Sequence, residues 1–272
     1  MSEPSRKCLS AEALCVEVPG RRLVEALTLT VRPGEVLAVL GPNGTGKTMT
    51  LMTLAGLRRP AGGRVLLGET DIRTLGRRQI ALELALLTQS TDDVFPATVL
   101  ETVLIGRHPH IGRWRWESRS DRRIAMAALA TMDIGELAGR NVLSLSGGER
   151  RRLSIAQVLT QSPSIYLLDE ATNHLDPPHQ LHALRVFRSL ADAGAAIVAT
   201  LHDVNLAERF ADRCLLLYGD GRWDLGATQD VLDDRRLAKL FATSFECVSW
   251  DGRRLFVATE PQAAGSPERS ET

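Results

Sequence analysis

The chain has 272 residues, and its 33 Lys and Arg side chains balance 33 Asp and Glu side chains, so its formal net charge at pH 7 is zero. A balanced charge excludes a global attraction to nucleic acid or another polyanionic surface, so any anion-binding site must come from local geometry. We therefore expect no nucleic-acid partner. The length allows one large α/β domain or two small ones with a sizeable core.

The cysteines and the N-terminus indicate the compartment. Cys8, Cys15, Cys214 and Cys247 are scattered and form no CxxC pair, which indicates free thiols in a reducing cytosol. The N-terminal segment MSEPSRKCLS lacks the apolar run of a signal peptide. No segment approaches the ~20 apolar residues that span a bilayer. If the protein serves a membrane process, we expect another chain to supply the membrane part.

The first part of the chain predicts strands around a glycine-rich loop. Apolar residues alternate with threonine over 27–31, the pattern of a half-buried strand, which predicts an N-terminal antiparallel β portion. The apolar run 36–40 is typical of a buried parallel strand, and a helix is predicted from Thr48 to Leu57. The apolar stretch 84–87 predicts another strand, which ends just before Gln89.

The second part predicts a helical insertion and then a parallel sheet. Residues 98–142 are mostly helical in pattern, with helices expected at 99–106 and 121–132. Strands expected at 165–168 and 195–200 flank a helix at 177–193, and such a βαβ unit predicts a parallel sheet. The remaining expected elements are a hairpin at 214–225, two short helices near 228–241, a strand pair near 246–258 and a disordered tail at 261–272.

The glycine-rich loop carries the clearest chemical motif. Residues 41–48, GPNGTGKT, match G-x-x-x-x-G-K-[ST] between a predicted strand and a predicted helix, which disfavours an ordinary glycine-rich turn. Backbone N–H groups and the helix N-terminus favour phosphate there, Lys47 can reach the β- and γ-phosphates, and Thr48 can hold Mg²⁺. The predicted nucleotide-binding residues of this loop are Gly41, Pro42, Asn43, Gly44, Thr45, Gly46, Lys47 and Thr48.

Two acids and a histidine follow neighbouring strands. Asp169 and Glu170 end the strand 165–168, at the sheet edge where open α/β folds bind ligands. Asp169 suits a water-mediated Mg²⁺ contact and Glu170 a general base, although a strand can also end in solvated acids. Because parallel strands end at one edge, His202 after the next strand can reach the γ-phosphate beside Glu170. A surface or helix-capping role is the alternative for His202.

A second glycine-rich helix start occurs in LSGGER, residues 145–150. The Ser146 hydroxyl and the N–H groups of Gly147 and Gly148 predict another anion-binding helix start. No strand precedes it and no lysine occupies the phosphate-loop position, so it is half of a nucleotide site.

Together these motifs resemble one family. The set GPNGTGKT, Gln89, LSGGER, IYLLDE, NHLD and His202, in this order and spacing, resembles the ATP-binding subunit of an ABC transporter over about residues 10–258. The resemblance implies an α/β P-loop NTPase core with a parallel sheet, an N-terminal antiparallel β portion and an inserted α-helical subdomain at about 98–160, all within a domain at 1–260. It also implies ATP hydrolysis with ATP and Mg²⁺ as cofactors, in a homodimer that sandwiches two nucleotides.

The resemblance assigns roles by position. Glu170 is the catalytic base, His202 the γ-phosphate switch, and Gln89 senses the metal and couples to the membrane subunit. Ser146, Gly147 and Gly148 act on the partner's nucleotide, and Asp176 belongs to a loop that crosses between subunits. Thr48, Gln89 and Asp169 are the expected Mg²⁺ residues.

Three positions depart from the family pattern. Val18 takes the place of an aromatic residue that stacks on adenine, which predicts weak discrimination between ATP and GTP. Met49 replaces a hydroxyl residue and is expected to keep only its backbone contact to phosphate. Ala171-Thr172 stands where the family more often has Pro-Thr, with little expected effect.

A single nucleotide unit without a membrane span fits an importer subunit. The stretches 95–99 and 106–110 resemble the subfamily importing ferric siderophores, haem and cobalamin, and overall similarity favours cobalamin. The implied partners are integral membrane permease subunits and, indirectly, a periplasmic or surface substrate-binding protein; the implied location is the cytoplasmic face of the inner membrane. His108 and His110 are interpreted as part of a loop near the membrane subunit, because two ligands do not make a metal site.

Two other classes of protein share part of this pattern. A soluble ABC ATPase of translation or DNA maintenance usually carries two nucleotide units or a long coiled coil, and neither occurs in this sequence. A P-loop kinase would account for GPNGTGKT but would leave LSGGER without a role.

Overall fold

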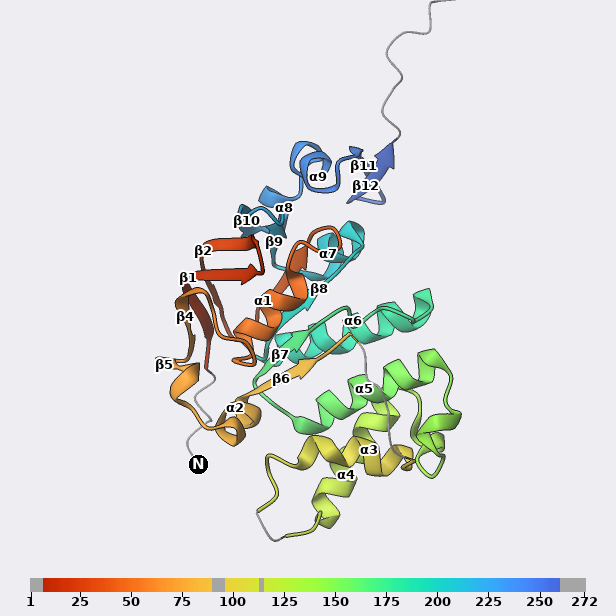
Figure 1. Ribbon diagram of the computed structural model, residues 1–272. Helices are drawn as coiled ribbons and strands as arrows, with labels where there is room; N and C mark the ends of the chain where they lie inside the picture. Colours follow the sequence, from red (N-terminus) through yellow and green to blue (C-terminus); the bar gives the residue numbers. More distant parts are fainter. Residues whose placement is uncertain (1–6, 90–95, 113–114, 260–272) are drawn as a thin grey trace, which may run out of the picture.

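A six-stranded sheet forms the centre of the molecule. The computed structural model describes residues 7–89, 96–112 and 115–259 (Figure 1). The strands of the central sheet run in the order β10-β9-β3-β8-β7-β6. Their bounds are β3 Val36–Leu40, β6 Leu84–Leu87, β7 Ile165–Leu168, β8 Ala196–Thr200, β9 Arg213–Leu217 and β10 Trp223–Ala227. Neighbouring strands from β9 to β6 pair in parallel, and β10 is antiparallel to β9.

A second, antiparallel sheet covers one face of the central sheet. Its order is β2-β1-β4-β5, with bounds β1 Leu9–Val18, β2 Arg21–Val31, β4 Gly62–Leu67 and β5 Thr70–Asp71. Its apolar residues form one core cluster with Leu37 and Val39 of β3 and with Leu51 and Leu54 of α1, Lys47–Leu54. The alternation over 27–31 is therefore explained, because Leu27, Leu29 and Val31 of β2 enter this core.

Helices cover the opposite face. Ala38 and Leu40 of β3 join a second core cluster with α6, Pro177–Asp192, and α7, Val204–Phe210. Both faces of the parallel strands are buried, which explains their continuous apolar runs. The short α2, Arg77–Glu83, and the 3₁₀ turn Ile72–Thr74 connect β5 to β6.

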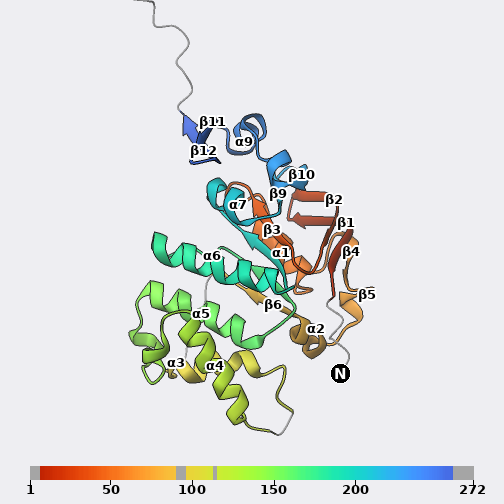
Figure 2. The same cartoon turned by 180° about the vertical axis from the view of Figure 1, so that it is seen from behind.

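A group of helices extends from one end of the sheet (Figure 2). It contains α3 Val99–Leu104, α4 Arg119–Thr131 and α5 Gly147–Gln161, with 3₁₀ turns at Ile105–Arg107, Gly135–Leu137 and Val142–Ser144. Each helix is preceded by a Ser or Thr whose hydroxyl oxygen accepts a hydrogen bond from the backbone N–H of an acidic residue three positions later. The carboxylate of that acidic residue in turn accepts a hydrogen bond from the backbone N–H of the Ser or Thr. Helix α5 contacts α3 and α4 and also β6, so it joins this helical group to the sheet.

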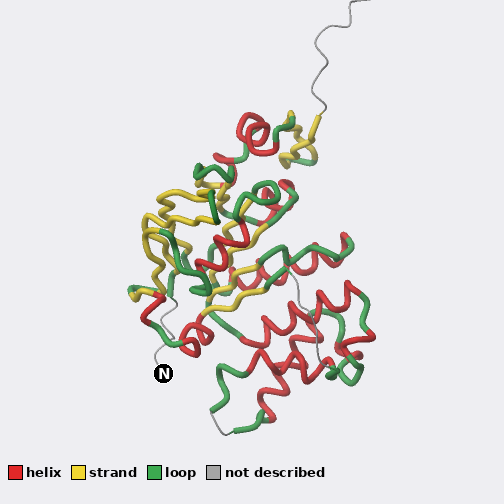
Figure 3. The backbone as a smooth tube through the Cα atoms, viewed as in Figure 1, coloured by secondary structure: helices red, strands yellow, loops and turns green. Residues whose placement is uncertain are grey.

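The C-terminal elements lie at the other end of the molecule. They are α8 Thr228–Val231, α9 Asp234–Phe241 and the antiparallel pair β11 Ser244–Trp250 and β12 Arg253–Thr259. The tube view shows the helical group of α3, α4 and α5 at the opposite end of the molecule from these elements, with the two larger sheets between them (Figure 3).

The expected α/β fold class is confirmed, with its parallel sheet, antiparallel portion and helical insertion. Elements β1, β4, β5 and α2 had no separate prediction from the sequence. The tail expected at 261–272 and Phe95 lie outside the described residues. Within the described ranges, no helix combines the length and apolar character needed to cross a membrane.

Candidate active site

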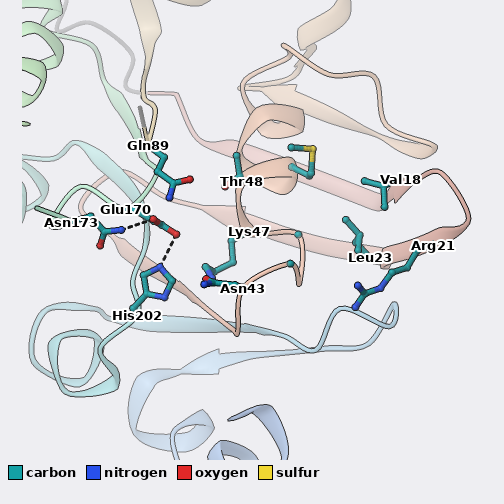
Figure 4. Close-up of a pocket in the computed structure, with 13 residues that line it drawn as sticks. Val18, Arg21, Leu23, Asn43, Lys47, Thr48, Gln89, Glu170, Asn173 and His202 are labelled. Atoms are coloured by element: carbon teal, nitrogen blue, oxygen red, sulfur yellow. Dashed lines mark hydrogen bonds and ion pairs between the residues drawn. The ribbon is translucent and has the colours of Figure 1, made fainter. Parts of the chain in front are cut away.

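The candidate site is a cavity of about 580 Å³ at the edge of the sheet where the parallel strands β3, β6, β7 and β8 end (Figure 4). Its lining residues are Val18, Arg21, Leu23, Asn43, Gly44, Gly46, Lys47, Thr48, Met49, Gln89, Glu170, Asn173 and His202. The cavity thus gathers the phosphate loop, Gln89, Glu170 and His202 from four separate stretches of the chain.

The phosphate loop curls around the side chain of Lys47. The Lys47 Nζ donates to the carbonyl oxygens of Gly41 at 2.7 Å and Pro42 at 3.2 Å. Gly46 adopts φ +102°, and a side chain there would place its Cβ 2.9 Å from Leu23 Cβ, so glycine is required. Burial lowers the pKa of Lys47, and the carboxylates of Glu170 and Asp169 oppose that shift. An anion in the cavity would therefore find a poorly solvated cation beside it.

Asp169 and Glu170 are held by a residue that the sequence analysis missed. The Thr200 hydroxyl donates to Asp169 Oδ1 at 2.9 Å and accepts the backbone N–H of Glu170 at 2.7 Å. All three residues are buried, with Asp169 only 2% exposed. Thr200 ends the apolar strand β8, AIVAT, and a hydroxyl at the end of such a strand is a signal that could have identified it.

The Glu170 carboxylate is bonded through both oxygens. His202 Nε2 lies 2.6 Å from Oε1, and Asn173 Nδ2 donates to Oε2 at 2.5 Å. Figure 4 shows these side chains converging on Glu170 from two loops, across the cavity from Lys47. Asn173 had no assigned role in the sequence analysis, although its place three residues after Glu170 makes contact feasible.

The oxygen donors here suit Mg²⁺ in combination with phosphate. Thr48 and Gln89 line the cavity, whereas Asp169 is not among its lining residues and has one carboxylate oxygen bonded to Thr200. Mg²⁺ prefers oxygen ligands and usually binds through one or two carboxylates together with substrate phosphates. Within the part of the chain that the structure describes, no cluster of three or more His, Cys, Asp or Glu residues forms a metal site by itself.

The other end of the cavity is bounded by Val18, Arg21 and Leu23. Arg21 Nε donates to the carbonyl oxygen of Gly219 at 2.8 Å, which fixes the guanidinium at the rim. Gly219 has φ +78°, and a Cβ there would lie 2.9 Å from Thr45 Cα. The loop of Gly219 is therefore packed closely against the phosphate loop. Arg21 and Leu23 were not predicted as site residues.

The second glycine-rich start lies apart from this cavity. Ser146, Gly147 and Gly148 are not among its lining residues, and Ser146 and Gly147 are exposed. The Ser146 backbone N–H donates to Glu149 Oε2 at 2.7 Å, and bonds from Ser146 lower the pKa of Glu149. Asp176, another predicted residue, is exposed at the start of α6. One subunit therefore brings the phosphate loop and Glu170 together but not LSGGER.

Comparisons with known proteins agree with this geometry. The sequence profile of the family described as ABC transporter matches residues 24–173. The hemin import ATP-binding protein HmuV of Pseudomonas entomophila is 41% identical over 239 residues, covering 86% of this chain and 92% of that protein. The cobalamin import ATP-binding protein BtuD of Halobacterium salinarum is 38% identical over 226 residues, covering 82% of this chain and 56% of that protein. Among solved structures, a metal-chelate type ABC transporter in an inward-facing conformation matches with TM-score 0.80 and 29% identity, covering 93% of this chain and 98% of that one.

Proposed function

The chain belongs to the ABC transporter family, and from this premise we propose that it is the ATP-binding and ATP-hydrolysing subunit of an importer for a metal-chelate cargo. The observation that carries the proposal is the placement of Glu170, bonded to His202 and Asn173, across one cavity from Lys47 and the phosphate loop. A general base and a phosphate-binding loop on opposite sides of one cavity are what hydrolysis of a phosphoanhydride requires.

Hydrolysis follows from the roles of these groups. The phosphate loop and Lys47 bind the β- and γ-phosphates, and Glu170 accepts a proton from the attacking water. The water oxygen bonds to the γ-phosphorus, the bond to the bridging oxygen breaks, and ADP and phosphate leave. His202 positions Glu170 and reaches the γ-phosphate. Thr48, Gln89 and Asp169 would hold Mg²⁺, which supplies charge neutralisation when it is bound.

The active form is a homodimer. The Ser146–Gly148 helix start faces solvent, lies outside its own subunit's cavity and has the backbone groups to bind an anion. These properties support a role on the γ-phosphate of a nucleotide held by a second subunit. Asp176, exposed at the start of α6, is assigned to the same interface.

A separate groove is assigned to the membrane permease. It has a volume of about 360 Å³ and lies beside the strand β6 that leads to Gln89. Its lining residues are Leu86, Leu87, Thr88, Ile105, Gly106, His108, Pro109, Ser154, Gln157, Val158 and Gln161. Such a contact would place the chain at the cytoplasmic face of the membrane, with a substrate-binding protein acting only through the permease.

Cargo is proposed as a class. The HmuV and BtuD relatives are named for hemin and for cobalamin, which are both metal chelates of a tetrapyrrole ring. The resemblance seen in the sequence analysis favoured cobalamin. The chain would be reconstituted with its permease and binding protein, and uptake of hemin, cobalamin and a ferric siderophore would be compared. ATP-dependent uptake of one of them is expected. If none of the three compounds were transported, the proposed class of metal-chelate cargo would be contradicted.

Replacing the general base tests the core of the proposal. Glu170→Gln is expected to lower the hydrolysis rate by at least about 100-fold while ATP binding is retained, because only the base is lost. The variant should form dimers with ATP, measured by light scattering. Glu136→Gln, an exposed glutamate outside the cavity, is the matched control. A Glu170→Gln chain that stays monomeric with ATP, alone and with the permease, would refute the proposed homodimer that holds two nucleotides between its subunits.

A further inference from the structure

Arg151 makes an unusual set of contacts for a buried cation. It belongs to α5, which begins directly after Ser146, and only 5% of the residue is exposed. All three guanidinium nitrogens donate to backbone carbonyl oxygens. The bonds are Nε to Ala171 at 3.1 Å, Nη1 to Thr88 at 2.7 Å and to Gln89 at 3.4 Å, and Nη2 to Asp169 at 2.8 Å and to Glu170 at 2.7 Å.

These carbonyls belong to two loops of the active site. One is the Glu170 loop, defined here as residues 169–171, and the other is the Gln89 loop, residues 88–89. A guanidinium presents five N–H groups in a fixed plane, so it can bond both loops at once, whereas an ammonium has three donors on a flexible stem. Burial lowers the pKa of Arg151, and the carboxylates of Asp169 and Glu170 oppose that shift.

The Glu170 loop needs such support. Glu170 has φ +52°, a left-handed backbone conformation that residues other than glycine rarely adopt. Conformations of this kind persist only where surrounding contacts determine them. Arg151 bonds the carbonyls of Asp169, Glu170 and Ala171, and so it fixes the backbone on both sides of the strained residue.

We propose that Arg151 is the positioning residue that holds the Glu170 loop and the Gln89 loop in fixed positions relative to helix α5. The inference rests on the proposed ATPase function. Because α5 begins at the LSGGER start, a guanidinium one turn further along links that start to the general base of its own subunit. Engagement of Ser146–Gly148 with the partner's nucleotide then acts on Glu170 through one side chain, without Arg151 touching ATP.

The test compares Arg151→Lys and Arg151→Met with the unaltered chain in the complex with its permease. We expect kcat to fall by about 10-fold or more in Arg151→Met, with an intermediate fall in Arg151→Lys, because small misplacements of a catalytic group are costly. The Kd for ATP should change less than twofold, since Arg151 does not line the cavity. Thermal unfolding identifies any variant that fails to fold, and Arg151→Lys then carries the test.

A double variant separates positioning from a general structural role. If Arg151 acts mainly through Glu170, adding Arg151→Met to Glu170→Gln should lower the residual single-turnover rate by a smaller factor than Arg151→Met lowers the rate of the unaltered chain. Arg107→Met is the matched control, because Arg107 is also buried and donates to a backbone carbonyl of α5, at Thr160, without contacting either loop. It should lose stability but keep kcat within twofold.

Three results would overturn the inference: a folded Arg151→Met chain with unchanged kcat, equal losses in kcat and ATP affinity, or additive effects in the double variant. Absence of hydrolysis in the unaltered complex would instead refute the proposed function, so the two failures are distinguishable.

Discussion

His202 Nε2 lies 2.6 Å from Glu170 Oε1, although 32 residues separate them in the chain. The contact exists because β7 and β8 pair in parallel and end at one edge of the sheet, with Glu170 and His202 in the loops that follow. Glu170 is buried, whereas the His202 side chain is 40% exposed to the cavity side. The imidazole is therefore placed to touch both the base and a ligand.

Loss of that imidazole should slow chemistry more than binding. His202→Ala is expected to lower kcat by roughly 100-fold, the scale of removing one group that stabilises or orients a transition state. The Kd for ATP should change little, because the phosphate loop supplies most of the phosphate contacts. Steady-state hydrolysis and equilibrium ATP binding measure the two effects. The matched control is His182→Ala, which removes an imidazole that is hydrogen-bonded to the Thr131 carbonyl oxygen and does not line the cavity. Equal losses in kcat and affinity for His202→Ala would contradict its assignment.

The chain should discriminate only weakly between ATP and GTP, because Val18 lies at the end of the cavity where we expect the nucleobase. Val18 lines the cavity where stacking on a base would need a ring, and base stacking on an aromatic side chain contributes about 1–3 kcal/mol. Competition between ATP and GTP in a hydrolysis assay should show similar kcat/KM values, and Val18→Tyr should tighten binding of both nucleotides by about tenfold. A strong preference of the unaltered chain for ATP would contradict this prediction.

Mixing two inactive variants should restore one site. In a Glu170→Gln background, Lys47→Ala disables the phosphate loop and Ser146→Arg disables the exposed helix start. A dimer of either variant alone has no complete nucleotide site. In a mixed dimer, the phosphate loop of the Ser146→Arg chain faces the intact helix start of the Lys47→Ala chain, so one complete site remains. ATP trapped by the mixture should therefore exceed the sum of the separate variants, as measured with labelled ATP after gel filtration.

A control for this mixture uses Ser249→Arg, an exposed serine of β11, in place of Ser146→Arg. That chain alone should trap ATP as the Glu170→Gln background does. If the mixture of Lys47→Ala and Ser146→Arg trapped no more than its components, the two half-sites would belong to one subunit.

Acid should remove one stabilising contact of the helical group. Bonds from Ser118 and then from the Arg107 guanidinium lower the pKa of Asp121 from 3.8 to about 2. Above pH 3.8 the Asp121 carboxylate is ionised in both the folded and the unfolded state, so its full contribution to the free energy of unfolding is present. That contribution is lost as the pH falls from 3.8 towards about 2, because the unfolded state takes up the proton first.

Urea unfolding of the unaltered chain and Asp121→Asn measures this effect. The difference between their free energies of unfolding should be constant near neutral pH and shrink below about pH 4. A difference that stays constant down to pH 3 would show that the Asp121 contacts are not ionic in the folded state.

Local patterns predicted most of the elements because they depend on neighbours in sequence. The run VLAVL is apolar at every position, and β3 is buried on both faces. GPNGTGKT specifies its own loop, since glycine and lysine at fixed spacing determine both the backbone path and the ligand. The strands β1 and β4 were harder to predict, because their pairing depends on residues far along the chain.

The sequence by itself determined which residue types stand at the ends of the strands and, through the missing lysine and strand before LSGGER, that this helix start is only half of a site. Only the tertiary structure decided that Thr200 holds both acids, that Asn173 and His202 share Glu170, and that Arg151 bonds two active-site loops. The physical reason is that hydrogen bonds to buried backbone groups depend on which strands and helices become neighbours, and a side chain's type does not specify its distant partner.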